Sequence, residues 1–211
     1  MLRPVSTRAC LLLAAMLCPS TAAVLAAESP AVETIVLVRH GEKPDDGLGQ
    51  LSCQGLNRAL ALPNVIRAMF GKPDFIFAPD PAHSKPDHWK AYDYVRPLAT
   101  IEPTAIRFAL PVNTQFGQED DKGLVAALER RDYHNALVLV AWEHRKIDDI
   151  ARALLADNGA DPRVHVPSWP YDDFDGIYVI RISRTSEGTH ATFEQKQEHL
   201  DGQPKQCPGD K

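Results

Sequence analysis

Two segments of the sequence place a histidine beside charged residues, each shortly after a run of apolar residues. Arg39 and His40 follow the β-branched run 31–38, and His144 follows the apolar run 136–141. An imidazole can attack phosphorus and carry the phosphoryl group as a covalent intermediate. A guanidinium binds phosphate oxygens through two parallel hydrogen bonds and keeps its charge. These residue types together predict phosphoryl-transfer chemistry, which also needs an acid to protonate the leaving group.

The fold must bring these side chains together. Both apolar runs are typical of buried strands, and a further short strand is expected at 73–78. Helices are expected from Ser52 towards residue 70, from about Tyr94, at 123–131 and at 147–157, with a terminal hairpin at 177–182 and 189–194. Alternating strands and helices predict an α/β three-layer sandwich with a mostly parallel central sheet, helices on both faces and antiparallel strands at the C-terminal edge. Ligands bind beyond the carboxyl ends of such strands, so the two histidines and Arg96 are expected in one crevice.

These segments resemble the histidine phosphatase superfamily, the phosphoglycerate-mutase-like clan. Residues 38–42 (VRHGE), followed by 51–59 (LSCQGLNRA), are similar to its opening signature. Residues 96–103 (RPLATIEP) resemble the start of the helix that carries the clan's second arginine. The strand that ends before His144 resembles its second histidine segment. The resemblance covers essentially the whole mature chain, with the elements in the correct order.

The resemblance implies a phosphatase that needs no metal ion or cofactor and acts on a small phosphorylated substrate. His40 would be the nucleophile. The phosphate pocket would be formed by Arg39, Arg96 and His144. We favour Glu143 as the acid that protonates the leaving group, because it is anchored at a strand end. The alternatives lie in the loop after the second-arginine helix and are Glu119, Asp120 and Asp121.

Two positions depart from the pattern of the clan. Many members have a serine and a basic residue shortly before the second arginine, whereas Ser84 and Lys85 lie well upstream of Arg96 here. Some members place a carboxylate directly after the second histidine, where this sequence has Arg145. Both departures concern the rim of the expected phosphate pocket.

Two other classes of function remain as alternatives. A phospho-ligand binding module would keep the pocket but lack a working acid, and would bind phosphate without turnover. A metal-dependent hydrolase would use the loop that carries His83 and His88, because imidazole and carboxylate groups bind Zn²⁺. A chelator would abolish activity in the second case only.

The first thirty residues differ in kind from the rest of the chain. Arg3 and Arg8 precede a short apolar run, and helix-breaking and then small residues follow. This order predicts a signal peptide at 1–27, before a histidine-phosphatase-like domain at 28–200 and a flexible tail at 201–211. The protein is therefore expected to be periplasmic or secreted, with no stable membrane insertion after signal cleavage.

The net charge and the cysteine content bear on the expected binding partners and on the cellular compartment. Cleavage of the signal removes two arginines, which leaves 21 basic and 28 acidic residues and a net charge of −7. Since the sequence also has no run of Lys and Arg, a nucleic-acid partner is not expected. Only Cys53 and Cys207 then remain. In an oxidising compartment they could pair and tie the tail to the first third of the domain, or they could stay unpaired thiols.

Overall fold

A six-stranded sheet lies at the centre of the computed structural model, which describes residues 31–87 and 89–210. Its strand order is β5-β2-β6-β1-β7-β8. The strands are β1 (Ala31–Arg39), β2 (Phe75–Phe77), β5 (Val112–Asn113), β6 (Leu137–Trp142), β7 (Gly176–Thr185) and β8 (Gly188–Gln197). The first four positions of that order pair in parallel, and β7 and β8 form an antiparallel edge. The expected signal peptide at 1–27 lies outside the described residues.

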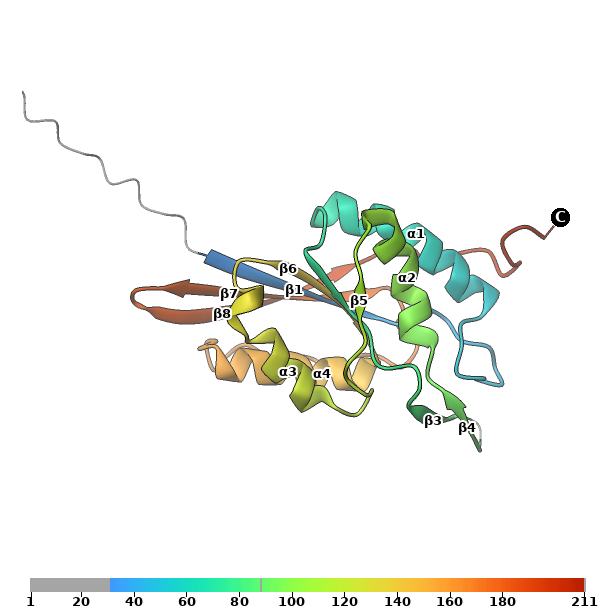
Figure 1. Cartoon of the computed structure of the whole chain (residues 1–211), viewed down its shortest axis with the longest axis horizontal. Helices are drawn as coiled ribbons and strands as arrows, with labels where there is room; N and C mark the ends of the chain where they lie inside the picture. Colours follow the sequence, from blue (N-terminus) through green and yellow to red (C-terminus); the bar gives the residue numbers. More distant parts are fainter. Residues whose placement is uncertain (1–30, 88, 211) are drawn as a thin grey trace, which may run out of the picture.

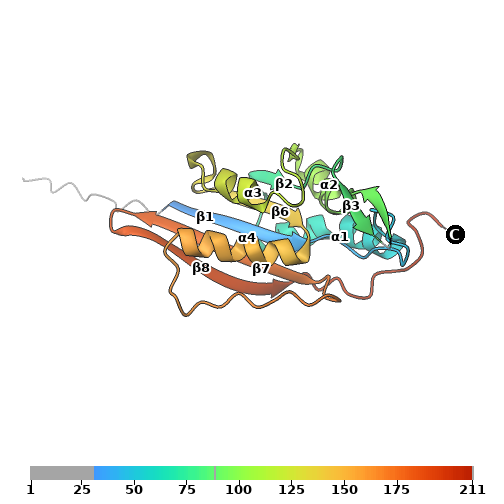
Figure 2. The same cartoon turned by 90° about the horizontal axis from the view of Figure 1, so that it is seen from below.

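Helices cover both faces of this sheet. They are α1 (Cys53–Met69), α2 (Arg96–Phe108), α3 (Asp121–Leu128) and α4 (His144–Asp157), with a short 3-10 turn at Arg131–Tyr133. Helices α1 and α2 lie on one face, and α3 and α4 lie on the other (Figures 1 and 2). The predicted α/β sandwich is confirmed. No helix in the described part of the chain is long and apolar enough to cross a bilayer.

The strand β1 is apolar on both sides because it has a helix layer above and below it. Ile35 and Leu37 belong to the core on the α3–α4 side, whereas Val36 and Val38 belong to the core on the α1–α2 side. The neighbouring strand β6 pairs with β1 in parallel, and Arg39 lies opposite Trp142 in this register. The residues that follow β1 and β6 therefore leave the sheet side by side.

Local signals in the sequence place the helices correctly. Ser52 caps α1, and its hydroxyl accepts a hydrogen bond from the backbone N–H of Gly55. A proline inside a helix removes a hydrogen bond and favours a kink or break, but α1 continues past Pro63 to Met69. Pro97 lies in the first turn of α2, where its missing N–H removes no helical hydrogen bond.

The sequence pattern missed a small hairpin. The segment 80–88 was expected to be a loop, but it contains β3 (Ser84–Asp87), which pairs with β4 (Lys90–Asp93) just after it. Such short polar strands, one of them with a proline, carry little of the β-branched or aromatic character that marks a strand in sequence. His88 lies outside the described residues.

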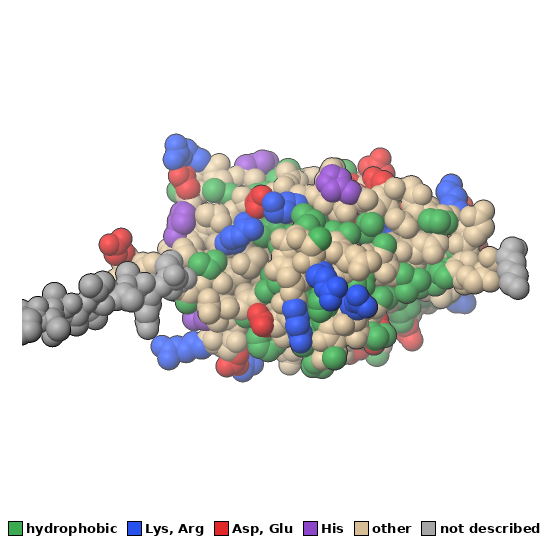
Figure 3. Space-filling view, turned by 90° about the horizontal axis from the view of Figure 1, so that it is seen from above, with side chains coloured by type: hydrophobic (Ala, Val, Ile, Leu, Met, Phe, Trp, Pro, Cys, Tyr) green, Lys and Arg blue, Asp and Glu red, His purple; other side chains and the backbone are tan. Residues whose placement is uncertain are grey.

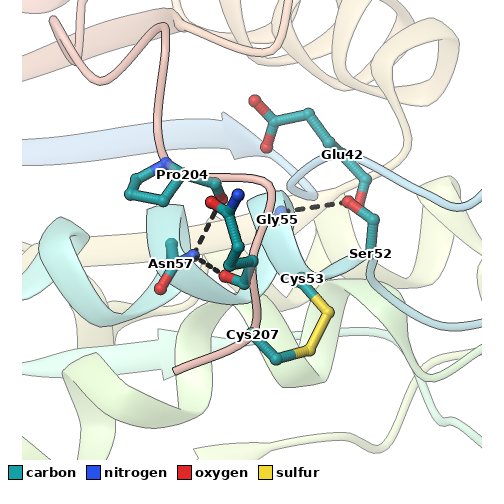
Figure 4. Close-up of a disulfide and its surroundings, with 8 residues drawn as sticks. Glu42, Ser52, Cys53, Gly55, Asn57, Pro204 and Cys207 are labelled. Carbon is teal, nitrogen blue, oxygen red and sulfur yellow. Dashed lines mark hydrogen bonds between the residues drawn. A yellow bond between two sulfur atoms is a disulfide. The ribbon is translucent and has the colours of Figure 1, made fainter. Parts of the chain in front are cut away.

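The C-terminal tail is attached to α1 rather than free. A disulfide joins Cys53 to Cys207, which settles the question that the cysteine count left open (Figure 4). The side-chain amide of Asn57 donates hydrogen bonds to the carbonyls of Pro204 (2.8 Å) and Gln206 (2.9 Å). The tail at 201–211, predicted to be flexible, is thus linked to α1 by a disulfide and two hydrogen bonds.

A buried arginine joins the tail to the rest of the domain. Arg58 of α1 has no exposed side-chain surface and pairs with four carboxylates. These belong to Glu42, Asp175, Glu198 and Asp201, at 2.8–3.0 Å. The crowding of acids has a consequence for Glu198. Its burial, which outweighs the charge of Arg58, raises its pKa to about 8.

This raised pKa predicts that the free energy of unfolding falls as the pH rises from 5 to 8. The unfolded chain releases the proton of Glu198 near pH 4.3, whereas the folded chain keeps it until about pH 8. Relative to Glu198→Gln, the wild type should lose ~4 kcal/mol of stability over this range in urea unfolding experiments.

Glu194→Gln provides the matched control, on the strand β8 that ends just before Glu198. The pKa of Glu194 is lowered by its hydrogen bonds to Lys196 and Arg181, so this residue is ionised in both states between pH 5 and 8. Its replacement should leave the pH dependence unchanged. Parallel profiles for the wild type and Glu198→Gln would contradict the prediction.

Candidate active site

The five residues predicted for the site line one pocket at the carboxyl ends of β1 and β6. The pocket has a volume of about 180 Å³. The predicted residues in its lining are Arg39, His40, Arg96, Glu143 and His144. Lining residues that the sequence did not single out for the pocket are Lys43, Lys85, Pro86, Asp87, Arg145 and Tyr171. The pairing of β1 with β6 explains the meeting of the two histidines, because each follows one of these strands.

His40 is held as a neutral imidazole with one free nitrogen lone pair. Its Nδ1 lies 2.8 Å from the carbonyl oxygen of Gly41, which can only accept a hydrogen bond. The proton therefore lies on Nδ1, and Nε2 keeps its lone pair. Burial lowers the pKa of His40 well below its usual range, and the charges of Arg96 and Arg39 lower it further. A neutral imidazole of this kind is a nucleophile.

The backbone after His40 is fixed by close packing of α1. The N–H of Gly41 donates to the hydroxyl of Thr100 on α2 (2.9 Å). A Cβ atom at Gly41 would lie 3.0 Å from the carbonyl oxygen of Gly55, and one at Gly55 would overlap the backbone of Glu42. Both glycines of the opening signature are needed because the helix approaches the loop this closely.

Arg39 brings a buried positive charge that faces no carboxylate partner. One terminal nitrogen donates to the carbonyls of Tyr171 (2.6 Å) and Asp173 (2.7 Å). The guanidinium lies 3.9 Å from the centre of the Phe174 ring, and its Nε is buried without a hydrogen-bond partner. Neutral groups thus orient Arg39 and leave its charge available to an anion.

Arg96 is the second buried cation of the pocket. It donates a 2.6 Å hydrogen bond to Asp87, which also accepts one from Lys43 (3.0 Å). Burial raises the pKa of Asp87, but these two hydrogen bonds outweigh burial and lower it. The guanidinium of Arg96 lies over the ring of Tyr94, and its Nε has no partner. Nε atoms of both arginines are therefore left for a ligand.

Glu143 combines a structural and a possible chemical role. Its carboxylate caps α4 by accepting hydrogen bonds from the backbone N–H groups of Arg145 (3.0 Å) and Lys146 (3.2 Å). Its other oxygen lies 2.9 Å from Nδ1 of His144, although the angles are not those of a hydrogen bond, and 3.8 Å from Lys85. Burial raises the pKa of Glu143, but these contacts prevail and bring it to about 2. Glu143 is therefore ionised when the pocket is empty.

The pocket has an excess of positive charge in an acidic protein. Its cations are Arg39, Lys43, Lys85, Arg96 and Arg145, and its anions are Asp87 and Glu143. With neutral imidazoles the lining carries a net charge of +3, whereas the whole chain carries −5. On the face seen in Figure 3, basic and acidic side chains are interspersed rather than gathered by sign. The local excess therefore favours an anionic ligand at this pocket.

The other residues considered from the sequence lie elsewhere. Glu119 and Asp121 pair with Lys146 at 2.8 and 3.5 Å, and Asp120 caps α3. None of the three lines the pocket. His83 lies 3.2 Å from Asp80, and His88 lies outside the described residues. Among residues 31–87 and 89–210 no group of three His, Cys, Asp or Glu residues could hold a metal ion.

Solved structures with this arrangement of strands and helices are phosphatases by name. A candidate phosphohistidine phosphatase, SixA, from Nakamurella multipartitia is 16% identical with a TM-score of 0.50, over 80% of this chain and 98% of that chain. A candidate alpha-ribazole-5'-P phosphatase from Escherichia coli is 13% identical with a TM-score of 0.50, over 78% and 96%. The chain has the histidine phosphatase fold. The mycobacterial glucosyl-3-phosphoglycerate phosphatase Rv2419c is similar at 15% identity and a TM-score of 0.49, over 77% and 97%. No protein-family model and no curated protein matches the sequence.

In this histidine phosphatase fold, a basic residue at the edge of the pocket comes from the β3–β4 hairpin, a position that the sequence did not predict. Lys85 lies well upstream of Arg96 in sequence, but the β3–β4 hairpin turns it towards the pocket beside Asp87. Lys85 and Asp87 are two residues apart on β3 and so face the same side. The segment 84–87 is too short and too polar to be recognised as a strand from its sequence.

The net positive charge of the lining, with its two buried arginines, predicts that inorganic phosphate binds at this pocket. Replacement of Arg96 by Gln removes a buried charge-assisted donor, and we expect the affinity for phosphate to fall at least tenfold in isothermal titration calorimetry. The matched control is Arg107→Gln, an exposed position at the end of the same helix, which should bind as the wild type does. Equal affinities for the wild type and Arg96→Gln would contradict this assignment.

Proposed function

We propose that the protein is an exported phosphatase that hydrolyses a small phosphomonoester through a phosphohistidine on His40. The proposal rests mainly on one observation. His40 is a buried neutral imidazole whose Nε2 keeps its lone pair, in a pocket with a net charge of +3. A nucleophile and an anion-binding site in the same cavity suit attack on phosphorus. The fold shared with phosphatases supports the same reaction class.

The proposed reaction has two steps. Nε2 of His40 attacks phosphorus, the bond from phosphorus to the leaving oxygen breaks, and that oxygen takes a proton from the carboxyl group of Glu143. Water then attacks the phosphohistidine, Glu143 takes a proton from the water, and the N–P bond breaks. Arg39, Arg96 and His144 hold the phosphoryl oxygens and stabilise the charge that spreads over them. The scheme uses no cofactor and no metal ion.

Glu143 needs a proton before it can act as the acid. Its pKa of about 2 describes the empty pocket, where cations and N–H groups stabilise the carboxylate. A phosphate dianion in the pocket places negative charge beside this carboxylate and draws on the same cations, and both effects raise the pKa of Glu143. Substrate binding thus favours the protonated form that the first step requires.

Export is supported by the N-terminal segment and by the disulfide. Residues 1–27 have the basic, apolar and small-residue order of a signal peptide. Disulfides persist in oxidising compartments and are rare in the cytosol. The Cys53–Cys207 bond therefore fits a periplasmic or secreted enzyme.

A phospho-ligand binding module without turnover is the second candidate. The low pKa of Glu143 favours it, because a permanently ionised carboxylate would leave the pocket without an acid. This candidate predicts that phosphate binds but that no phosphate ester is hydrolysed.

The proposed nucleophile predicts phosphatase activity that survives a chelator and depends on His40. The mature protein should release phosphate from p-nitrophenyl phosphate in the presence of EDTA, and His40→Ala should lower kcat at least a thousandfold. Quenching in alkaline detergent during turnover should trap a phosphoenzyme that is stable in alkali and labile in acid, in the wild type only. The control His190→Ala alters an exposed histidine on β8 and should keep full activity.

Each result that differs from this expectation would support a different function. Phosphate binding without turnover selects the binding module. Activity that EDTA abolishes selects a metal-dependent hydrolase, and activity that persists in His40→Ala excludes His40 as the nucleophile.

The role of Glu143 predicts a dependence on the leaving group. Glu143→Gln should lower kcat/KM for an alkyl phosphate by about a hundredfold, since an alkoxide needs a proton to leave. The same variant should lower kcat/KM for p-nitrophenyl phosphate by less than tenfold, because that leaving group departs as a stable anion. An equal loss on both substrates would assign Glu143 a structural role as the cap of α4.

A further inference from the structure

One buried aromatic side chain beside the phosphate pocket has no role in the proposed two-step reaction. Tyr94 is fully buried two residues before α2, and its ring lies edge-to-face with the imidazole of His40, at 6.0 Å between the ring centres. Burial raises the pKa of the phenol, so it stays neutral. Its hydroxyl has no hydrogen-bond partner among the described residues. Because no hydrogen bond accounts for this residue, the contacts of its ring have to be considered.

The ring of Tyr94 contacts two cations of the phosphate pocket. The guanidinium carbon of Arg96 lies 4.9 Å from the centre of the ring, and Nζ of Lys85 lies 5.0 Å from it. A cation within about 6 Å of an aromatic face is attracted by the negative charge of that face, most strongly when the cation is shielded from water. Arg96 is 3% exposed and the side chain of Lys85 is 26% exposed. Both cations therefore gain from the ring.

The two cations come from different elements, and Tyr94 lies between these elements. Lys85 belongs to the strand β3 of the hairpin, whereas Arg96 is the first residue of α2. The backbone N–H of Tyr94 donates a hydrogen bond to the carbonyl of Pro81 (3.1 Å), which closes the base of the segment that contains the hairpin. The backbone of Tyr94 is thus fixed where the hairpin meets the helix, and its ring contacts one cation from each.

An aromatic ring can hold a cation in place without neutralising it. A carboxylate partner also orients a cation, as Asp87 does for Arg96, but its negative charge opposes the binding of phosphate. Another carboxylate in the place of Tyr94 would lower the net charge of the pocket below +3. The neutral ring leaves this charge unchanged, so the two cations stay available to an anion.

We propose that Tyr94 is a positioning residue of the phosphate pocket, and that its ring holds Lys85 and Arg96 in place through cation–π contacts. The residue acts through these two cations and does not touch the substrate itself. Its effect on catalysis rests on the proposed phosphatase function, whereas its effect on the binding of inorganic phosphate can be measured without turnover.

The test changes the charge on the face of the ring while its size stays nearly constant. Tyr94 is replaced by phenylalanine and then by phenylalanines with one, three and five fluorine atoms, which withdraw negative charge from the face step by step. Tyr94→Phe should bind phosphate as the wild type does, because the hydroxyl has no partner. The Kd for phosphate in isothermal titration calorimetry should then rise with each step, by about tenfold at five fluorines. The kcat/KM for p-nitrophenyl phosphate should fall in the same order.

Two further variants separate this role from a general effect on packing. In a Lys85→Met background the fluorine series should have a smaller effect on phosphate binding, because one of the two cations is missing. The matched control places pentafluorophenylalanine at Phe77, a buried ring of β2 that packs against Tyr133 and contacts no cation in the described part of the chain. This control should leave the Kd for phosphate unchanged.

The inference is overturned if the Kd for phosphate does not depend on the number of fluorine atoms, since the ring would then serve only to fill space. It is also overturned if Tyr94→Phe already accounts for the whole loss, because the hydroxyl and not the ring would then be responsible. An undiminished fluorine effect in the Lys85→Met background would exclude Lys85 as a partner of the ring and overturn the inference in the same way. Absence of p-nitrophenyl phosphate hydrolysis in the wild type, with the fluorine effect on phosphate binding retained, would instead refute the phosphatase function, so the two failures are distinguishable.

Discussion

The site depends on a buried positive charge that the protein itself does not neutralise. Arg39 is 2% exposed and is held by backbone carbonyls and an aromatic ring, not by a carboxylate. Burial of a charge without a counter-ion is costly, and the strands and helices around it have to supply that free energy. An anion that enters the pocket recovers part of this cost. Burial lowers the pKa of His40, and the same charge, with that of Arg96, lowers it further, so that the imidazole stays neutral.

A second buried arginine shows the opposite arrangement. Arg58 has four carboxylate partners, so its charge is more than balanced, and burial together with these neighbouring carboxylates keeps the proton on Glu198. Arg58 joins α1 to the tail and to Glu42, which follows the His40 loop. The difference between Arg58 and Arg39 distinguishes a structural arginine from one that can bind a ligand. An arginine saturated with carboxylates fastens elements together, whereas one bound only by carbonyls is prepared for a ligand.

Much of the fold and of the site could be predicted because both follow from strands with strong patterns. Strands β1 and β6 are continuous apolar runs, and residues at the ends of adjacent parallel strands must meet, which is why His40 and His144 could be paired from sequence. The β3–β4 hairpin could not be predicted, and the position of Lys85 was missed with it. The attachment of the tail could not be predicted for another reason: it depends on one disulfide, two hydrogen bonds and an ion pair, not on an apolar pattern.

The ionisation of Glu143 depends on geometry that no sequence pattern reveals. The same carboxylate caps α4 and borders the phosphate pocket, so the N–H groups that fix its position also lower its pKa. The contacts that hold the Glu143 carboxylate in position therefore also oppose its protonation. A phosphate dianion resolves the conflict, because it competes with the carboxylate for Lys85 and repels its charge. The acid would thus exist only while substrate is bound, which confines proton transfer to the step that needs it.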